Sequence, residues 1–368
     1  MSLNRSFATT IILMTAIAAL AACAPRFERM PLPPGELERA YGVPGSENQS
    51  GLPVSAKPGP AIAFSGGGQK GAFGAGLMVG WTERGDRPEF SVVTGVSTGA
   101  ILALFTFLGP QYDNTLETLY TRYQTRDLLR RNYLGGLLGG NALDNAAPYR
   151  SLIDLYISDA VIDDIAAEAR KGRKLLLGST DLDSKGPYLW DVTEIAASDH
   201  PDRGRLIRDV IQASSAIPAV FPPIIIPFVD ASGRSGDQLH VDGGMTRPFV
   251  YRPITAPKSS RFSSVFLVIN EFIDPGFKAV EPNLRNVASA AVETAVTTSV
   301  RDELILFADA TTRTGIPWYG TAIPDTFTLQ PKQQFDPDYM RQLFELGSTS
   351  IINGRTWSLN EKSVRKLR

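Results

Sequence analysis

The sequence predicts an α/β fold in which one mostly parallel sheet carries helices on both faces. Short apolar runs suited to buried strands alternate with segments of helical character, and glycine-rich turns follow the first two of these runs. With 43% hydrophobic and 20% charged residues, the 368-residue chain has the balance of a globular protein. We therefore expect one α/β domain over residues 60–350, with a processed segment before it and a C-terminal tail at residues 351–368.

Composition excludes several classes of function. The formal net charge is −1 and Lys and Arg do not cluster, so we expect no nucleic-acid partner. The chain has one cysteine and two histidines, which excludes a disulfide within the chain and a Cys/His zinc site. The chemistry inferred below requires no metal ion and no organic cofactor.

The N-terminus has the organisation of a signal peptide. Residues 1–22 carry Arg5 and then an apolar run shorter than the ~20 residues that span a bilayer. The sequence L-A-A-C that ends at Cys23 resembles the lipobox of bacterial lipoprotein precursors, in which the cysteine is acylated after cleavage. This resemblance implies a lipid anchor in the membrane of the cell envelope. Ala24, in place of an Asp, favours the outer membrane if the source has two membranes. Plain secretion and an uncleaved anchor are the alternatives.

Residues 23–59 are interpreted as a tether between the lipid and the domain. Eight prolines lie from Pro25 to Pro60 among Gly, Ser and Asn, a composition that keeps the backbone extended and offers little to bury. The alternative is an ordered arm laid over the domain.

The first predicted strand, Pro60–Ser65, runs into a glycine loop at residues 66–71 and then into a helix over Ala72–Trp81. Consecutive glycines let backbone amides converge on one point, and the following helix adds its positive end, so the loop is suited to hold an anion. It is not a Walker phosphate loop, because Lys70 lacks the flanking residues of that motif.

The glycine loop also matches the G-x-G-x-x-G pattern of dinucleotide-binding proteins. That function requires an acidic residue at the end of the second strand, and Phe90–Thr94 ends without one. We therefore favour an oxyanion hole. A purely structural turn is the alternative.

Residues 95–99 read G-V-S-T-G, the pattern of a nucleophile elbow. A predicted strand precedes them and an apolar helix follows, so Ser97 lies on a sharp turn that exposes its hydroxyl. Gly95 and Gly99 keep side chains from crowding this turn.

The nucleophile needs a base, and histidine is scarce. A triad in the order Ser, acid, His is not available, because no histidine follows His240. His200 lies in a polar segment that resembles a surface loop. Asp242 ends a short strand before two glycines, where it serves either as the base or as a turn cap. His240 lies two residues earlier on the same strand face, so a His-dependent mechanism stays open.

In combination, these segments resemble the patatin-like phospholipase family. The matching segments are G-G-G-Q-K-G at 66–71, G-V-S-T-G at 95–99, A-S-S-A-I-P at 213–218 with F-P-P at 221–223, D-G-G at 242–244, and weaker echoes at 179–182 and 335–337.

The resemblance implies a three-layer α/β/α fold and a serine acyl hydrolase that cleaves lipid acyl esters, of the phospholipase A, lysophospholipase or lipase type, through an acyl-enzyme. It implies that Ser97 is the nucleophile and Asp242 the base of a Ser-Asp dyad. It also implies that the amides of Gly66, Gly67 and Gly68 form the oxyanion hole. The expected partner is a lipid or acyl-ester substrate.

One segment departs from the family pattern. Many relatives follow D-G-G with Asn residues before a proline, where this chain has M-T-R-P at 245–248, which leaves the substrate preference open. Amphipathic helices over 112–131 and 147–170 either line the entrance or belong to the scaffold, and the loop 135–140 is a candidate lid. The alternative functions are a catalytically inactive lipoprotein with a binding or structural role and a nucleotide-dependent oxidoreductase.

Overall fold

The computed structural model describes residues 29–31, 37, 57–128, 130–131, 144–218, 220–229, 232–255, 262–277 and 279–367. The predicted signal peptide, Cys23, most of the predicted tether and the candidate lid at 135–140 lie outside these residues. Among the described helices, none combines the length and apolar character needed to cross a bilayer.

A single large sheet forms the centre of the domain, with the strand order β10-β9-β1-β2-β5-β8-β7 and with β6 paired to β5. The strands are β1 (Gly59–Phe64), β2 (Val92–Val96), β5 (Lys174–Asp181), β6 (Gly186–Asp191), β7 (Ile224–Val229), β8 (Ser235–Asp242), β9 (Phe262–Phe272) and β10 (Trp318–Ile323). The five strands from β10 to β5 are parallel, and β6, β7 and β8 are antiparallel to their neighbours. A separate two-stranded pair joins β3 (Arg130–Arg131) and β4 (Asp144–Asn145). The prediction of a mostly parallel sheet is confirmed.

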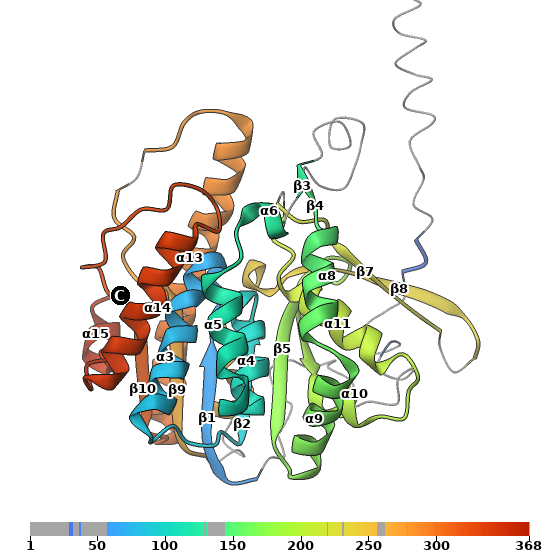
Figure 1. Cartoon of the computed structure of the whole chain (residues 1–368), viewed down its shortest axis with the longest axis horizontal. Helices are drawn as coiled ribbons and strands as arrows, with labels where there is room; N and C mark the ends of the chain where they lie inside the picture. The colour runs from blue at the N-terminus through green and yellow to red at the C-terminus, as the bar shows by residue number, and fades with distance from the viewer. Residues whose placement is uncertain are drawn as a thin grey trace, which may run out of the picture.

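Helices cover both faces of this sheet (Figure 1). They are α3 (Gly71–Arg84), α4 (Thr98–Leu108), α5 (Asp113–Thr121), α6 (Thr125–Leu128), α8 (Ala147–Tyr156), α9 (Asp159–Arg170), α10 (Val192–Ala197), α11 (Arg203–Ser214), α12 (Arg252–Thr255), α13 (Leu284–Thr314), α14 (Pro337–Ile352) and α15 (Glu361–Arg365). In Figure 1, α3, α4, α5 and α14 lie in front of the sheet and α13 lies behind it.

The alternation of side chains along β1 shows how the layers form. Ile62 and Phe64 point into the core shared with α3, α4, α11 and α14. Ala61 and Ala63 point into a second core, which contains buried residues of α13 such as Phe307. Because successive residues of a strand face opposite sides, a central strand that is apolar on both faces requires helices on both sides. The α/β/α prediction is thus confirmed.

Two long predicted helices are each divided. The segment 112–131 forms α5 and α6, and the segment 147–170 forms α8 and α9. Ser158 separates the second pair because its backbone is extended and its side chain accepts a hydrogen bond from the amide of Val161, which starts a new helix. The break turns α8 toward the carboxyl ends of the strands, near the site described below.

Both flanks of the predicted domain contribute to packing. Residues 351–368, predicted as a tail, complete α14 and form α15, whose Val364 is buried in the second core. In the predicted tether, Leu37 is fully buried in the first core, and Arg29 and Met30 contact Asp237 of β8.

Candidate active site

Ser97 occupies the sharp turn between β2 and α4. Its backbone has φ 58° and ψ −129°, a conformation that residues other than glycine rarely adopt. The turn is crowded: a Cβ on Gly99 would lie 2.5 Å from the carbonyl oxygen of Ser65. The predicted elbow is therefore formed, and the strain at Ser97 is of the kind that accumulates at functional sites.

Ser214 supports this turn from α11. Its hydroxyl accepts a hydrogen bond from the amide of Ser97 at 2.9 Å and donates one to the carbonyl of Gly178 at 2.6 Å. Ser214 belongs to the A-S-S-A-I-P segment that carries the family resemblance, but the sequence did not indicate this contact. It links the nucleophile turn to β5, the next strand of the sheet.

Asp242 ends β8, where this strand pairs antiparallel with Ser179 of β5. Its amide donates to the carbonyl of Ala216 at 2.9 Å, and its Oδ1 accepts from the amide of Gly244 at 2.7 Å. The residue is 5% exposed, and within the described part of the chain Oδ2 makes no hydrogen bond of normal geometry. One carboxylate oxygen is thus held by the turn while the other is left for a proton.

Burial dominates the electrostatics of this carboxyl group. It raises the pKa of Asp242 to about 6, against smaller lowering effects of the Ser97 hydroxyl and the Gly244 amide. The geometry agrees: a Cβ on Gly243, next to Asp242, would lie 2.9 Å from Cγ1 of Val96, next to Ser97, although 145 residues separate Ser97 and Asp242 along the chain. The fold brings together the nucleophile and the base that the sequence predicted.

The glycine loop lies against the same serine. A Cβ on Gly66 would come within 3.2 Å of the Ser97 Cβ, and Gly67 has φ 152° and no room for a Cβ, which would lie 2.1 Å from the carbonyl oxygen of Asn270. Asn270, at the end of β9, holds the loop: its side-chain amide donates to the carbonyl of Ser65 at 2.9 Å. Its Oδ1 accepts from the amide of Gly74 at 3.1 Å. No sequence pattern marked this asparagine.

The predicted set of three oxyanion-hole amides needs one correction. The amide of Gly66 donates to the carbonyl of Pro248 at 3.0 Å and is therefore not available to an oxyanion in this structure. In the described part of the chain, the amides of Gly67 and Gly68 make no hydrogen bond to the protein. The loop thus offers two amides beside Ser97, and Gly66 instead ties the loop to the segment that follows D-G-G.

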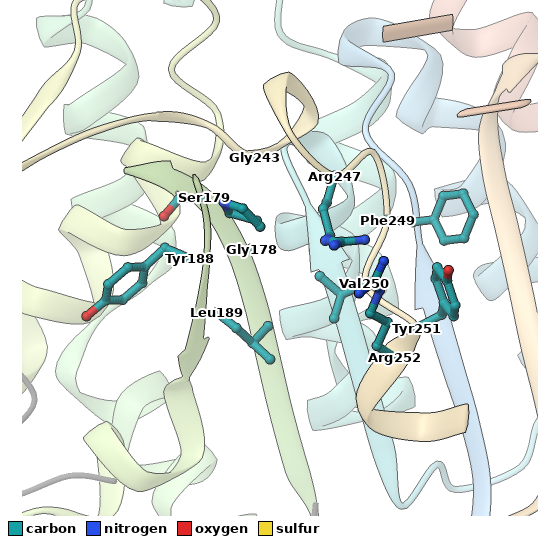
Figure 2. Close-up of a pocket in the computed structure, with 11 residues that line it drawn as sticks. Gly178, Ser179, Tyr188, Leu189, Gly243, Arg247, Phe249, Val250, Tyr251 and Arg252 are labelled. Carbon is teal, nitrogen blue, oxygen red and sulfur yellow. The ribbon is translucent and has the colours of Figure 1, made fainter. Parts of the chain in front are cut away.

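A cavity of about 360 Å³ lies on the other side of the sheet, toward the second core (Figure 2). Its lining includes Gly243, Phe249 and Tyr251 but neither Ser97 nor Asp242. Here Arg247 forms an ion pair with Glu303 of α13 at 2.6 Å. This pair connects α13 to the M-T-R-P segment, where the sequence departs from the family pattern. The residues that differ from the family therefore anchor the loop after Asp242 to α13.

A larger cavity, of about 860 Å³, opens at Ser97. Apolar and aromatic side chains from α4, α5, α6, α8, α11 and α14 and from the adjoining loops form most of its wall. They are Ile101, Phe105, Leu119, Tyr120, Tyr123, Leu128, Tyr149, Leu152, Ile153, Tyr156, Ile157, Ile211, Ile217, Phe221, Phe335 and Met340. Gly68, Gln69, Ser97, Thr98 and Ser215 add polar groups to the lining. An apolar wall with a few polar groups suits a long apolar ligand with one reactive polar group.

Neither histidine contacts the candidate nucleophile. His240 is fully buried, with Nδ1 3.0 Å from the Ser179 hydroxyl and Nε2 3.1 Å from Oε1 of Gln238. Burial lowers the pKa of His240 to about 4, so the ring is neutral at pH 7. Nδ1 of His200 accepts from the amide of Asp202 in the loop before α11. Both ring nitrogens of His240 are thus occupied within a structural network.

No group of three or more His, Cys, Asp and Glu residues suited to a metal ion is found within the described ranges.

Asp242→Asn is expected to stabilise the fold at pH 8 and to have little effect at pH 4. The pKa of Asp242 is raised from 3.8 to about 6, so the folded state binds this proton more tightly than the unfolded state. That stabilisation is complete below pH ~4 and is lost as the pH rises through ~6, which leaves a buried anion at a cost on the order of 3 kcal/mol. An Asn side chain carries no charge, and its Oδ1 can still accept the hydrogen bond from the Gly244 amide.

Thermal unfolding followed by circular dichroism at both pH values measures this effect. Asp86→Asn is the matched control, because Asp86 is exposed and pairs with Arg84. A melting temperature of Asp242→Asn at pH 8 below that of the unmodified protein contradicts the analysis.

Comparison with known proteins places this site in a family. The sequence profile described as patatin-like phospholipase matches residues 62–254, which include the elbow and Asp242. A search of curated proteins found no match. Among solved structures, VipD from Legionella pneumophila is 13% identical, with a TM-score of 0.36 over 82% of this chain and 67% of that one.

Two further structures show similarity of the same order. Human GIVD cytosolic phospholipase A2 is 9% identical, with a TM-score of 0.37 over 90% of this chain and 63% of that one. ExoU from Pseudomonas aeruginosa, in its complex with SpcU, is 12% identical, with a TM-score of 0.36 over 83% of this chain and 54% of that one. The chain thus spans from about half to two thirds of these proteins. The family profile covers more than half of the chain, and the protein therefore belongs to the patatin-like phospholipase family.

Proposed function

We propose that this protein is a serine acyl hydrolase that cleaves lipid acyl esters, with Ser97 as the nucleophile and Asp242 as the base. The proposal rests on one arrangement: a strained serine lines a large, mostly apolar cavity and lies beside a buried carboxylate. Family membership supports the reaction class, and the cavity supports a long acyl chain as the group transferred.

In the first step Asp242 accepts the proton of the Ser97 hydroxyl as the oxygen attacks the ester carbonyl. A general base works best when its pKa is near the working pH, and burial raises the pKa of Asp242 to about 6. The C–O bond to the alcohol then breaks, and the alcohol leaves with the proton that Asp242 returns. This produces an acyl-enzyme on Ser97.

The amides of Gly67 and Gly68 stabilise the oxyanion of the tetrahedral intermediate. They belong to the loop beside Ser97, and within the described part of the chain their N–H groups donate no hydrogen bond to the protein. In other enzymes, each such donor contributes about 3 kcal/mol to transition-state stabilisation. Asn270 and the Gly66 amide hold the loop in place before substrate binds. Water then attacks the acyl carbonyl carbon with Asp242 again as the base, the bond from this carbon to Oγ of Ser97 breaks, and Asp242 returns the proton to Oγ as the carboxylic acid leaves.

We also propose that Cys23 carries the lipid anchor and that the mature protein acts at a membrane of the cell envelope. The lipobox-like sequence before Cys23 and the preference of the cavity for apolar ligands both support this placement.

Ser97→Ala and Asp242→Asn are each expected to lower ester turnover by at least about 10³-fold, because each removes one member of the dyad. His200→Ala and His240→Gln should retain most of the activity. The measurement is hydrolysis of a soluble ester, together with labelling by a fluorophosphonate that should modify Ser97 alone. Loss of turnover in His240→Gln with retention in Asp242→Asn contradicts the dyad, and a folded protein that takes no label is an inactive family member.

The pH dependence of kcat/KM should show one inflection near pH 6. The base is active only when deprotonated, so activity should fall about tenfold per pH unit below pH ~6 and be constant above it. The measurement uses the soluble ester, with circular dichroism to show that the protein stays folded. An inflection near pH 4, the ordinary range of an exposed Asp, is the result that excludes a buried base.

Ile101→Trp should select against long acyl chains. Ile101 lines the cavity one helical turn after Ser97, so an indole there fills the space next to the reacting carbon. We expect the ratio of kcat/KM for a C16 ester to that for a C4 ester to fall about tenfold or more. Ile101→Ala is the control and should keep the preference for the long ester. Equal losses for both esters in Ile101→Trp contradict this assignment of the cavity.

A further inference from the structure

Arg29 forms a double ion pair with the domain. Its Nη1 and Nη2 donate to the two carboxylate oxygens of Asp183 at 2.9 and 2.6 Å, and its Nε donates to Oδ1 of Asp237 at 2.9 Å. These hydrogen bonds raise the pKa of the guanidinium and lower the pKa of Asp183. The geometry is the bidentate kind that holds a side chain in one orientation.

The backbone around Arg29 is bound as well. The amide of Asp237 donates to the carbonyl of Met30 at 2.9 Å, the amide of Met30 donates to Oδ2 of Asp237 at 2.5 Å, and Pro31 forms a parallel bridge with Asp237. This edge of β8 is open because β5 pairs with β8 only at its end, over Ser179–Asp181. Residues 29–31, the N-terminal arm, therefore extend the sheet where β5 has ended.

The arm and the candidate base lie on the same strand. Asp237 and Asp242 are five residues apart on β8, about 17 Å in an extended strand. Cys23 precedes Arg29 by six residues, which reach at most about 20 Å. A lipid at Cys23 is therefore held within a short distance of the strand that carries Asp242, and Figure 1 shows the arm beside β8.

Three large apolar side chains in the arm or on neighbouring segments are exposed. Met30 is 54% exposed next to Arg29, and Leu182 is 43% exposed next to Asp183. Val229, 57% exposed, pairs with Ser235 at the far end of the β7-β8 ladder. Exposed apolar side chains of this kind suit contact with the interface of a bilayer.

We propose that the pairing of Arg29 with Asp183 and Asp237, the Arg29 clamp, shortens the chain between a lipid at Cys23 and the domain and so holds the β8 edge close to the bilayer. The inference rests on the proposed lipid anchor and the proposed hydrolase activity. The partner is the lipid surface to which the anchor is attached.

The size of the effect follows from the number of residues that separate the lipid from the first contact with the domain. With the clamp intact, this contact is at Arg29, six positions after Cys23. Without it, the next described contact is the buried Leu37, fourteen residues from Cys23. Effective concentration falls roughly as the −3/2 power of linker length, so losing the clamp should lower access to membrane substrate about fourfold. Greater freedom of orientation adds to this loss.

The test compares two substrates of one protein. The full lipidated chain is reconstituted in vesicles of phosphatidylcholine and phosphatidylglycerol, and turnover of vesicle lipid is measured beside turnover of a soluble butyrate ester. Arg29→Ala should lower vesicle turnover about fourfold or more and leave ester turnover within twofold. Lys57→Ala is the control, because Lys57 forms an exposed ion pair with Glu89 away from the arm, and it should change neither rate.

Cys23→Ser supplies the second arm of the test, because it removes the site of the lipid. In that background Arg29→Ala should have no further effect on vesicle turnover. Unchanged vesicle turnover in lipidated Arg29→Ala overturns the proposal, as does an equal loss on both substrates or an intact mass that shows no lipid on Cys23. Failure of the hydrolase assignment is distinct, because the unmodified protein would then lack ester turnover and fluorophosphonate labelling.

Discussion

The burial of one carboxylate beside Ser97 is the constraint on which the rest of the site depends. Water would stabilise Asp242 as an ion but would also lower its pKa and make it a weaker base. At the end of β8 the residue is 5% exposed, and within the described part of the chain the Gly244 amide donates the one hydrogen bond of normal geometry to its carboxyl group. The remaining oxygen is available to a proton because the protein leaves it unoccupied.

This arrangement is unfavourable for folding and is supported by the surrounding structure. A positive φ at Ser97 costs on the order of 1–3 kcal/mol, and an ionised buried carboxylate costs a similar amount. Ser214, Asn270 and the Arg247–Glu303 pair each tie a part of the site to a different strand or helix. Two apolar cores, one on each side of the sheet, provide the rigid frame that such strain requires.

The antiparallel strand β8 joins the chemistry to the proposed membrane contact. One end of the strand carries Asp242, the proposed base, and its other half carries Asp237, which binds the N-terminal arm. A segment rich in proline and polar residues has little to bury by itself, yet an unpaired strand edge can bind it through backbone hydrogen bonds. The alternative of an ordered arm, left open from composition, is thus realised at residues 29–31.

The sequence by itself determined the local backbone chemistry: the elbow at Ser97, the glycine loop, the carboxylate before two glycines, and the absence of a histidine after His240. Such features depend on conformational preferences within a few residues, which a pattern records. Tertiary structure alone decided that Gly66 donates to Pro248, that Asn270 and Ser214 hold the turn, that an apolar cavity opens at Ser97, and that Arg29 binds Asp183 and Asp237. These contacts join residues 36 to 208 positions apart, and their partners are chosen by packing, which no local pattern encodes.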